Sequence, residues 1–193
     1  MMKLDRDFYL QDTLTVAKQL LGKYIVREHN GTRLVAKITE TEGYIGSVDK
    51  ACHCFGGKAT PRTKIMFETG GYAYVYLIYG MYYCFNVVTE KSGNGCAVLI
   101  RGAKPVENVE YMSRLRYNKS YNELSDYQIK NFANGPGKLC KALDITKALN
   151  GEDLLADKLY ITEGEAVKAF KTGKRINIDY AEEAKDFLWR FYL

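Results

Sequence analysis

The feature that most constrains the fold of this 193-residue chain is a pair of extended segments joined by Asn30-Gly31. The first segment is "KYIVREH" and the second is "TRLVAKITETE", and both contain several residues that favour strands. Asn-Gly is the dipeptide that best tolerates the positive φ angles of a two-residue hairpin turn. The sequence therefore predicts a β-hairpin over residues 23–42, and with it an antiparallel pair of strands.

The second segment ends in two glutamates. Strand alternation places Glu40 and Glu42 on the more apolar face, which also carries Leu34, Ala36 and Ile38. A glutamate at the edge of a buried face is partly desolvated, which raises its pKa and suits it to proton transfer near neutrality. The alternative is a pair of carboxylates that face solvent at a strand end. Paired carboxylates also suit glycosidic chemistry, but residues i and i+2 lie side by side and cannot easily flank one bond, which favours a single working carboxylate.

The rest of the chain predicts short helices and strands. Asp12 should cap a helix that ends at Gly22, and Pro105 should open a second helix, because a first turn does not need its missing N–H. Ser125 begins the pattern of a capping box for a third helix. Residues 43–71 should form a long connection with little regular structure, of a kind that often carries function. The segment "GCAVLIRGA" and the C-terminal tail should add further strands.

Composition narrows the class of protein. Apolar residues make up 47% of the chain and charged residues 26%, and we find no repeat or linker, so we expect one mixed α/β domain over residues 1–193. The net charge of +5 fits an anionic partner such as nucleic acid, although many ordinary proteins carry such a charge. We expect no secretion signal and no membrane span, because no apolar run is long enough. Five irregularly spaced cysteines favour reduced thiols in a cytoplasmic protein.

The segment "GYAYVYLIYGMYYCFN" holds six of the 16 tyrosines between Tyr72 and Tyr83. We expect a second hairpin here, with Tyr79-Gly80 at its tip. A buried sheet explains the tyrosines of the strands, because tyrosine is a good strand residue. It does not explain an exposed ring at the tip, which would suit a wedge inserted between stacked bases. An ordinary surface tyrosine in a turn is the alternative.

Two shorter motifs suggest chemistry. "CHC", Cys52 to Cys54, invites a metal site, but zinc sites usually need a second Cys or His pair, and His29 is the only other histidine. We therefore expect no metal and no cofactor, with His53 as a hydrogen-bond partner. "NGPGK" fails the phosphate-loop pattern, yet its glycines and Lys138 before a helix would suit a DNA or RNA phosphate. A plain turn at a helix start explains the same residues.

Four longer motifs resemble those of the alkyladenine DNA glycosylases, also called 3-methyladenine DNA glycosylases. They are "ITETEGYIGSVDKACHCFGGKATPRTKIMF", "GYAYVYLIYGMYYCFNVV", "AVLIRGAKP" and "NGPGKLCKALDI". The resemblance implies an α+β fold: a single compact domain with a curved antiparallel sheet, flanking helices and a protruding hairpin. It also implies a monofunctional base excision repair enzyme without metal or lyase step. Such an enzyme flips alkylated purines, and by extension deaminated ones such as hypoxanthine, out of duplex DNA and hydrolyses the N-glycosidic bond.

The resemblance also implies roles for individual residues. Glu42 of "TEGY" would activate the attacking water, and Arg101 would help to hold that water and the flipped nucleotide. Tyr44, His53 and Tyr76 would line the pocket around the flipped base. Such a cage suits an alkylated purine, because that base carries positive charge and is attracted by electron-rich rings. The same charge makes the base a good leaving group.

Further residues match the DNA-binding part of that family. Asn86 would disfavour the exocyclic amine of guanine, and Tyr79 would fill the gap that the flipped base leaves in the stack. Met81 and Lys138 would contact the DNA. The implied partner is damaged double-stranded DNA, bound by a monomer in the cytoplasm, or in the nucleus if the source is eukaryotic.

One conflict and one rival interpretation follow from these assignments. A two-residue turn at Tyr79-Gly80 would place Tyr76 and Asn86 on opposite faces of the sheet, so we predict a bulge or a longer loop in this hairpin. The rival is a non-catalytic module that binds distorted DNA or RNA. Glu42 argues against it, because a carboxylate in a pocket would repel phosphate and gives nothing to a pure binder.

Overall fold

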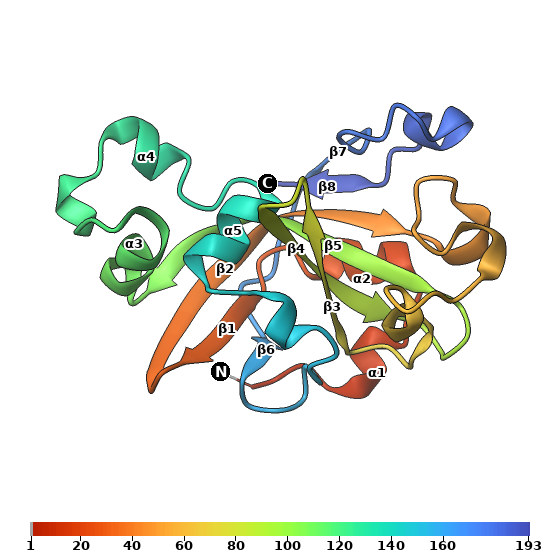
Figure 1. The fold of residues 1–193 in the computed structure, drawn as a ribbon, viewed down its shortest axis with the longest axis horizontal. Helices are drawn as coiled ribbons and strands as arrows, with labels where there is room; N and C mark the ends of the chain where they lie inside the picture. Colours follow the sequence, from red (N-terminus) through yellow and green to blue (C-terminus); the bar gives the residue numbers. More distant parts are fainter. Residues whose placement is uncertain (1) are drawn as a thin grey trace.

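The structure, a computed structural model, describes residues 2–193 as an antiparallel sheet with short helices around it (Figure 1). The main path of the sheet runs β3-β4-β5-β2-β1-β6, and β8 pairs with both β2 and β7. The strands are β1 Tyr24–His29, β2 Thr32–Tyr44, β3 Ala73–Ile78, β4 Tyr82–Thr89, β5 Cys96–Glu107, β6 Leu159–Thr162, β7 Lys171–Gly173 and β8 Arg190–Tyr192. The α-helices are α1 Arg6–Tyr9, α2 Thr13–Gln19, α3 Val109–Tyr117, α4 Asp126–Lys130 and α5 Pro136–Ala142. The predicted α+β class is confirmed.

The first hairpin forms as predicted. Asn30 and Gly31 have φ angles of 49° and 77°, so both turn residues adopt the left-handed conformation that the Asn-Gly pair favours. Tyr24 pairs with Lys37 and His29 pairs with Thr32, without a break in register. This hairpin gives β2 its place in the centre of the sheet, with β5 on its other side.

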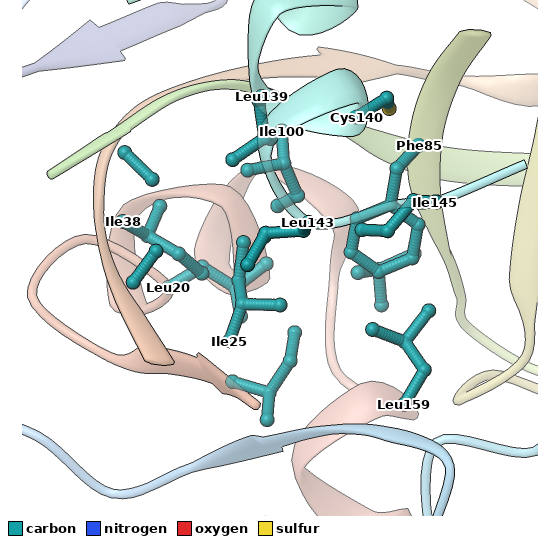
Figure 2. Packing of buried hydrophobic residues seen from close by; sticks show 14 of the residues in the cluster. Leu20, Ile25, Ile38, Phe85, Ile100, Leu139, Cys140, Leu143, Ile145 and Leu159 are labelled. Atoms are coloured by element: carbon teal, nitrogen blue, oxygen red, sulfur yellow. The ribbon is translucent and has the colours of Figure 1, made fainter. Parts of the chain in front are cut away.

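The main hydrophobic core lies between one face of the sheet and the helices α2 and α5. Leu20, Ile25, Ile38, Phe85 and Leu139 are fully buried in it, and Figure 2 shows their side chains converging. Each such side chain stabilises the fold by about 1.5–3 kcal/mol relative to exposure. The Asp12 side chain accepts a hydrogen bond from Thr15 N–H and so caps α2, as predicted.

The alternation of side chains along β2 is interrupted before Glu42. Our expectation that Glu42 shares a face with Ile38 was therefore wrong. Ile38 is buried in the main core, and Thr41, three residues later, donates its hydroxyl to Ala17 O of α2 at 2.8 Å. Residues three apart on a regular strand point to opposite faces, so the register shifts on both sides of Glu40 change the facing. Glu42 therefore lies on the face opposite Ile38, away from the main core.

Pro105 does not open a helix. It lies inside β5, opposite Ala36, and α3 begins only at Val109. The ladder between β4 and β5 is confined to Cys96–Leu99 on the β5 side, so this part of β5 is not paired with β4. A proline without an N–H is tolerated there.

The tyrosine hairpin has a three-residue loop, Tyr79 to Met81, because Ile78 pairs with Tyr82. The predicted longer loop is therefore confirmed. In this register Tyr74 pairs with Asn86 and Tyr76 pairs with Cys84, so all four side chains share one face of the sheet.

The remaining elements match the expectations closely. Ser125 and Gln128 form the predicted capping box of α4, and Pro136 is in the first turn of α5. Residues 46–67 contain only short 3-10 turns between loops. No helix within residues 2–193 is both long and apolar enough to cross a membrane.

Candidate active site

A cavity of about 890 Å³ lies on the sheet face that points away from the main core. Its walls come from β3, β4 and β5, from the connection after β2, from α3 and α5, and from residues 176–180. No aspartate or glutamate is among the described residues that line it. Five cations are: Arg62, Arg101, Arg116, Lys138 and Lys141. The cavity is therefore suited to an anionic ligand.

Glu42 is fully buried directly behind this cavity. Its cross-strand partner on β5 is Leu99, whose partner on β4 is Asn86, and both of these line the cavity. Ile176 N–H donates to Glu42 Oε1 at 2.8 Å, and Tyr44 OH donates to Oε2 at 2.9 Å. Burial raises the pKa of Glu42, although these two donors and Arg101 oppose the rise.

Arg101 connects Glu42 to the cavity. Its Nη1 donates to Glu42 Oε2 at 3.4 Å, the longest of the three hydrogen bonds to that carboxylate. Its Nε also lies 3.3 Å from Glu40 Oε1. Arg101 and Tyr44 line the cavity, whereas Glu42 does not. These two side chains therefore lie between the Glu42 carboxylate and a ligand in the cavity.

An aromatic cage forms the deeper wall. The rings of Tyr74 and Tyr76 are stacked with centroids 5.2 Å apart, and the His53 ring meets Tyr76 edge-on at 4.7 Å. His53 Nδ1 lies 2.9 Å from Tyr74 OH, within hydrogen-bond distance. Burial, with Arg62 nearby, lowers the pKa of His53 to about 4. The imidazole is therefore neutral at pH 7 and does not repel a cationic ligand.

The tip of the β3–β4 hairpin stands at the mouth of the cavity. Tyr79 is 71% exposed and Met81 is 67% exposed. Tyr79 has a φ of 52°, in the left-handed region. Lys138, on α5, also lines the cavity, and its Nζ donates to the Asn131 and Asn134 side-chain oxygens at 2.7 and 2.9 Å. Of the residues of the predicted site, all but Glu42 and Met81 line the cavity; Glu42 is buried behind it, and Met81 lies on the exposed hairpin loop next to Tyr79.

The surroundings of "CHC" bear on the metal interpretation and on whether its two thiols are reactive. All five cysteines are free and buried. The Cys54 thiol and burial raise the pKa of Cys52, which lines the cavity, so Cys52 is not a reactive thiolate. The same hydrogen bond lowers the pKa of Cys54, but this thiol is fully buried and does not line the cavity. Among residues 2–193 no three His, Cys, Asp or Glu side chains are grouped so that they could hold a metal ion.

Three residues of the site escaped the analysis of the sequence. Tyr74 was assigned to packing, but it lines the cavity and contacts His53. Arg175 and Asp49 form a fully buried ion pair at 2.5 and 2.8 Å, and Arg175 Nη1 also donates to Gly43 O. This pair holds the chain next to Ile176, whose N–H binds Glu42. Asp49 and Arg175 are 126 positions apart, and no sequence motif links them.

The comparisons with known proteins agree with this geometry. The family model of methylpurine-DNA glycosylase (MPG) matches residues 7–193. A protein of Clostridium novyi (strain NT) is 55% identical over 193 residues, covering 100% of this chain and 96% of its own. A protein of Clostridium perfringens (strain SM101 / Type A) is 54% identical with the same coverage. One of Clostridioides difficile (strain 630) is 48% identical over 98% of this chain and 100% of its own.

All three relatives carry the name "Putative 3-methyladenine DNA glycosylase". The matched residues 7–193 contain all strands of the sheet and all residues that line the cavity. The chain belongs to the methylpurine-DNA glycosylase family, and it is a DNA glycosylase, an enzyme of DNA repair that hydrolyses N-glycosyl bonds.

Proposed function

We propose that the protein is a monofunctional glycosylase that removes alkylated purines such as 3-methyladenine from duplex DNA. The target base would be flipped into the aromatic cage and released by a water that Glu42 activates. The observation that carries this proposal is the buried Glu42 carboxylate, held by three donors directly behind a cavity with aromatic and cationic walls. The alternative, a non-catalytic module that binds distorted DNA or RNA, does not explain this carboxylate.

The cage supports recognition of a cationic base. Tyr74 is buried with its ring stacked on that of Tyr76, so the partly exposed Tyr76 is the ring that can offer a face to a charged purine, at about 0.5–2 kcal/mol for a good contact. His53 is neutral and adds no repulsion, because burial lowers its pKa to about 4. Asn86 donates its amide to Tyr74 O at 3.1 Å, so its orientation in the pocket is defined. Asn86 can therefore discriminate between purines by the size and polarity of the groups on the edge of the base.

The geometry also supports a place for the water. The contact between Arg101 Nη1 and Glu42 Oε2 is long, at 3.4 Å, and a hydrogen bond of this length is weak. We place the nucleophilic water at this contact, where Arg101 would orient it and Glu42 would accept its proton. Catalytic hydrogen bonds in a free enzyme are often long and tighten only when substrate binds.

The chemistry balances without a metal or cofactor. The water oxygen forms a bond to C1′ of the sugar while the bond from C1′ to the purine nitrogen breaks. The departing base takes the electron pair and becomes neutral if it was cationic, so no acid is needed. Glu42 takes the water proton, and its negative charge stabilises an oxocarbenium-like sugar in the transition state.

The test compares the wild type with Glu42→Gln for release of 3-methyladenine from methylated duplex DNA, with and without EDTA. Because Glu42→Gln removes the general base, single-turnover release of 3-methyladenine should slow by about 10²- to 10⁴-fold. EDTA should have no effect on the wild type. Glu28→Gln, on β1 and ion-paired with Arg33, is the control and should retain the wild-type rate.

Several outcomes would contradict the proposal. These are full activity of Glu42→Gln, metal-dependent release, or lesion binding by the wild type without any release. Trapping of a covalent adduct with borohydride would contradict the absence of a lyase step, because such trapping requires a Schiff base between an amine and the sugar.

A further inference from the structure

Glu40 is a second carboxylate at this site, and its contacts differ from those of Glu42. Its Oε1 accepts a hydrogen bond from Arg190 Nη1 at 3.1 Å and lies 3.3 Å from Arg101 Nε. Glu40 is 21% exposed, so it is less deeply buried than Glu42. Two arginines thus converge on one carboxylate oxygen, and only one of them also reaches Glu42.

Arg101 is held between the two carboxylates without a strong bond to either. A bidentate pair of arginine and carboxylate has contacts of about 2.7–2.9 Å. Arg101 instead makes one contact of 3.4 Å to Glu42. Its Nε, 3.3 Å from Glu40, has no hydrogen-bond partner among residues 2–193, so that contact is an ion pair alone. The guanidinium therefore divides its charge between two carboxylates.

The backbone explains this arrangement. In the ladder of β2 and β5, Glu40 pairs with Gly102 and Thr41 pairs with Ile100, so Arg101 has no direct cross-strand partner. On the other side of β2, Arg190 of β8 pairs with Glu42, and its side chain reaches Glu40 instead. The irregular register therefore sets Arg101 diagonally between Glu40 and Glu42.

We infer that Glu40 is a positioning residue, which holds part of the Arg101 charge away from Glu42 and so keeps Glu42 a strong enough base for its water. The inference rests on the proposed role of Glu42. If Arg101 paired with Glu42 alone, its charge would stabilise the carboxylate and weaken it as a proton acceptor. Arg190 acts in the opposite sense to Glu40, because it competes with Arg101 for the same oxygen.

Other groups also act on Glu42, and the test must separate them from Glu40. Burial raises the pKa of Glu42 most, and the charge of Glu40 raises it further. The charged or titratable groups that face Glu42 from neighbouring strands and from the C-terminal segment are Glu40, Tyr44, Cys84, Arg101, Arg175 and Arg190. Of these, only Arg101 contacts both carboxylates.

The experiment measures the titration of Glu42 in the free protein by ¹³C NMR of labelled glutamate, and the pH dependence of single-turnover base release. In Glu40→Gln, Arg101 should move onto Glu42. The midpoint of the titration and the acid limb of the rate should then move to lower pH, and the plateau rate should fall roughly threefold. In Arg190→Gln, Glu40 should hold Arg101 more tightly, and the midpoint should move to higher pH.

Two further variants show whether Glu40 acts through Arg101. In an Arg101→Gln background, adding Glu40→Gln should produce only the smaller shift of the NMR midpoint that comes from the direct repulsion between Glu40 and Glu42. Glu40→Asp keeps the charge but shortens the reach, so it should shift the midpoint in the direction of Glu40→Gln by a smaller amount. If Glu40→Gln does not fold, Glu40→Asp replaces it in the titration. Affinity for lesion DNA should be unchanged in Glu40→Gln, and Glu28→Gln is the charge-matched control.

The two proposals can fail separately. Shifts of Glu40→Gln and Arg190→Gln in the same direction, no shift in either, or a Glu40→Gln shift that is equally large with and without Arg101 would overturn the role of Glu40. The NMR titration needs no substrate, so it still decides this point if the wild type releases no base. A wild type that releases no base would instead overturn the proposed function.

Discussion

At the scale of single residues, the three hydrogen bonds to Glu42 come from separate parts of the chain. Tyr44 lies two positions away, Arg101 lies 59 positions away, and Ile176 lies 134 positions away. Ile176 follows Arg175, whose guanidinium is buried against Asp49 and lies between the rings of Tyr44 and Trp189. The Asp49–Arg175 pair thus supports the position of a donor that it does not itself supply.

The first residue-scale prediction concerns this buried pair. Asp49→Asn would leave the Arg175 charge unpaired in the interior, which should lower the free energy of unfolding by about 3–5 kcal/mol. Urea denaturation measures the change. Asp186→Asn, which breaks an exposed pair with Lys174, is the control and should cost less than about 1 kcal/mol. Similar small losses in both variants would show that the buried pair is not a structural support.

At the scale of elements, the β3–β4 hairpin decides which tyrosines serve the cavity. Its three-residue loop places Tyr74 and Tyr76 on the cavity face and leaves Tyr79 at the exposed tip. A loop shorter by one residue would turn one strand of the hairpin over relative to the other, because side chains alternate with a period of two. Gly137 of α5 packs against the Tyr82 side chain, where an added Cβ would meet Tyr82 Cβ at 2.9 Å and the ring at 3.0 Å, so the hairpin is also supported from the side.

The element-scale prediction is that Tyr79→Ala weakens binding of lesion DNA about 5- to 150-fold, because a ring that stacks on a base contributes about 1–3 kcal/mol. Thermal stability should hardly change, since the ring is 71% exposed. Fluorescence anisotropy with a lesion duplex gives the affinity. Tyr127→Ala, on α4, removes a ring that is 75% exposed and does not line the cavity, and should bind normally. Equal losses of affinity and stability in Tyr79→Ala would favour a structural tyrosine.

At the scale of the whole molecule, charge is distributed unevenly. The chain has a net charge of +5, and the cavity wall carries five cations without a lining carboxylate among the described residues. Exposed lysines elsewhere are often ion-paired, as Lys174 is with Asp186 and Lys158 is, more distantly, with Glu152. Among the described residues, Arg101 is ion-paired with Glu40 and Glu42, whereas the other four cavity cations have no ion-pair partner. Their positive charge marks the face toward which DNA would be attracted.

The whole-molecule prediction concerns salt. Affinity for duplex DNA should fall linearly on a log–log plot against salt concentration, because bound cations release counterions from DNA. Lys141→Ala should lower that slope by about 1, the value for one lost phosphate contact. Lys158→Ala, which removes the same charge at the far edge of the sheet next to β6, should leave the slope unchanged. A lower slope in Lys158→Ala and an unchanged slope in Lys141→Ala would show that DNA binds to another face.

Local patterns predicted much of the fold. The Asn30-Gly31 turn, the Asp12 cap and the Ser125 capping box formed as expected, because each depends on residues within a few positions of one another. Pro105 was misjudged, because whether its missing N–H matters depends on where the ladder with β4 ends. The residues that gather at the cavity were found from the family's motifs, whereas Tyr74 was taken for a packing residue.

What the sequence by itself determined is the set of hairpins and caps and, through the resemblance, the identity of the residues that meet at the cavity. What only the tertiary structure decided is the face on which Glu42 lies and the charges around it. The register shifts near Glu40 reversed the predicted facing of β2. The Glu40, Arg101 and Arg190 contacts arise where three strands meet. Electrostatic environment depends on distances through space, and alternation along one strand cannot supply those distances.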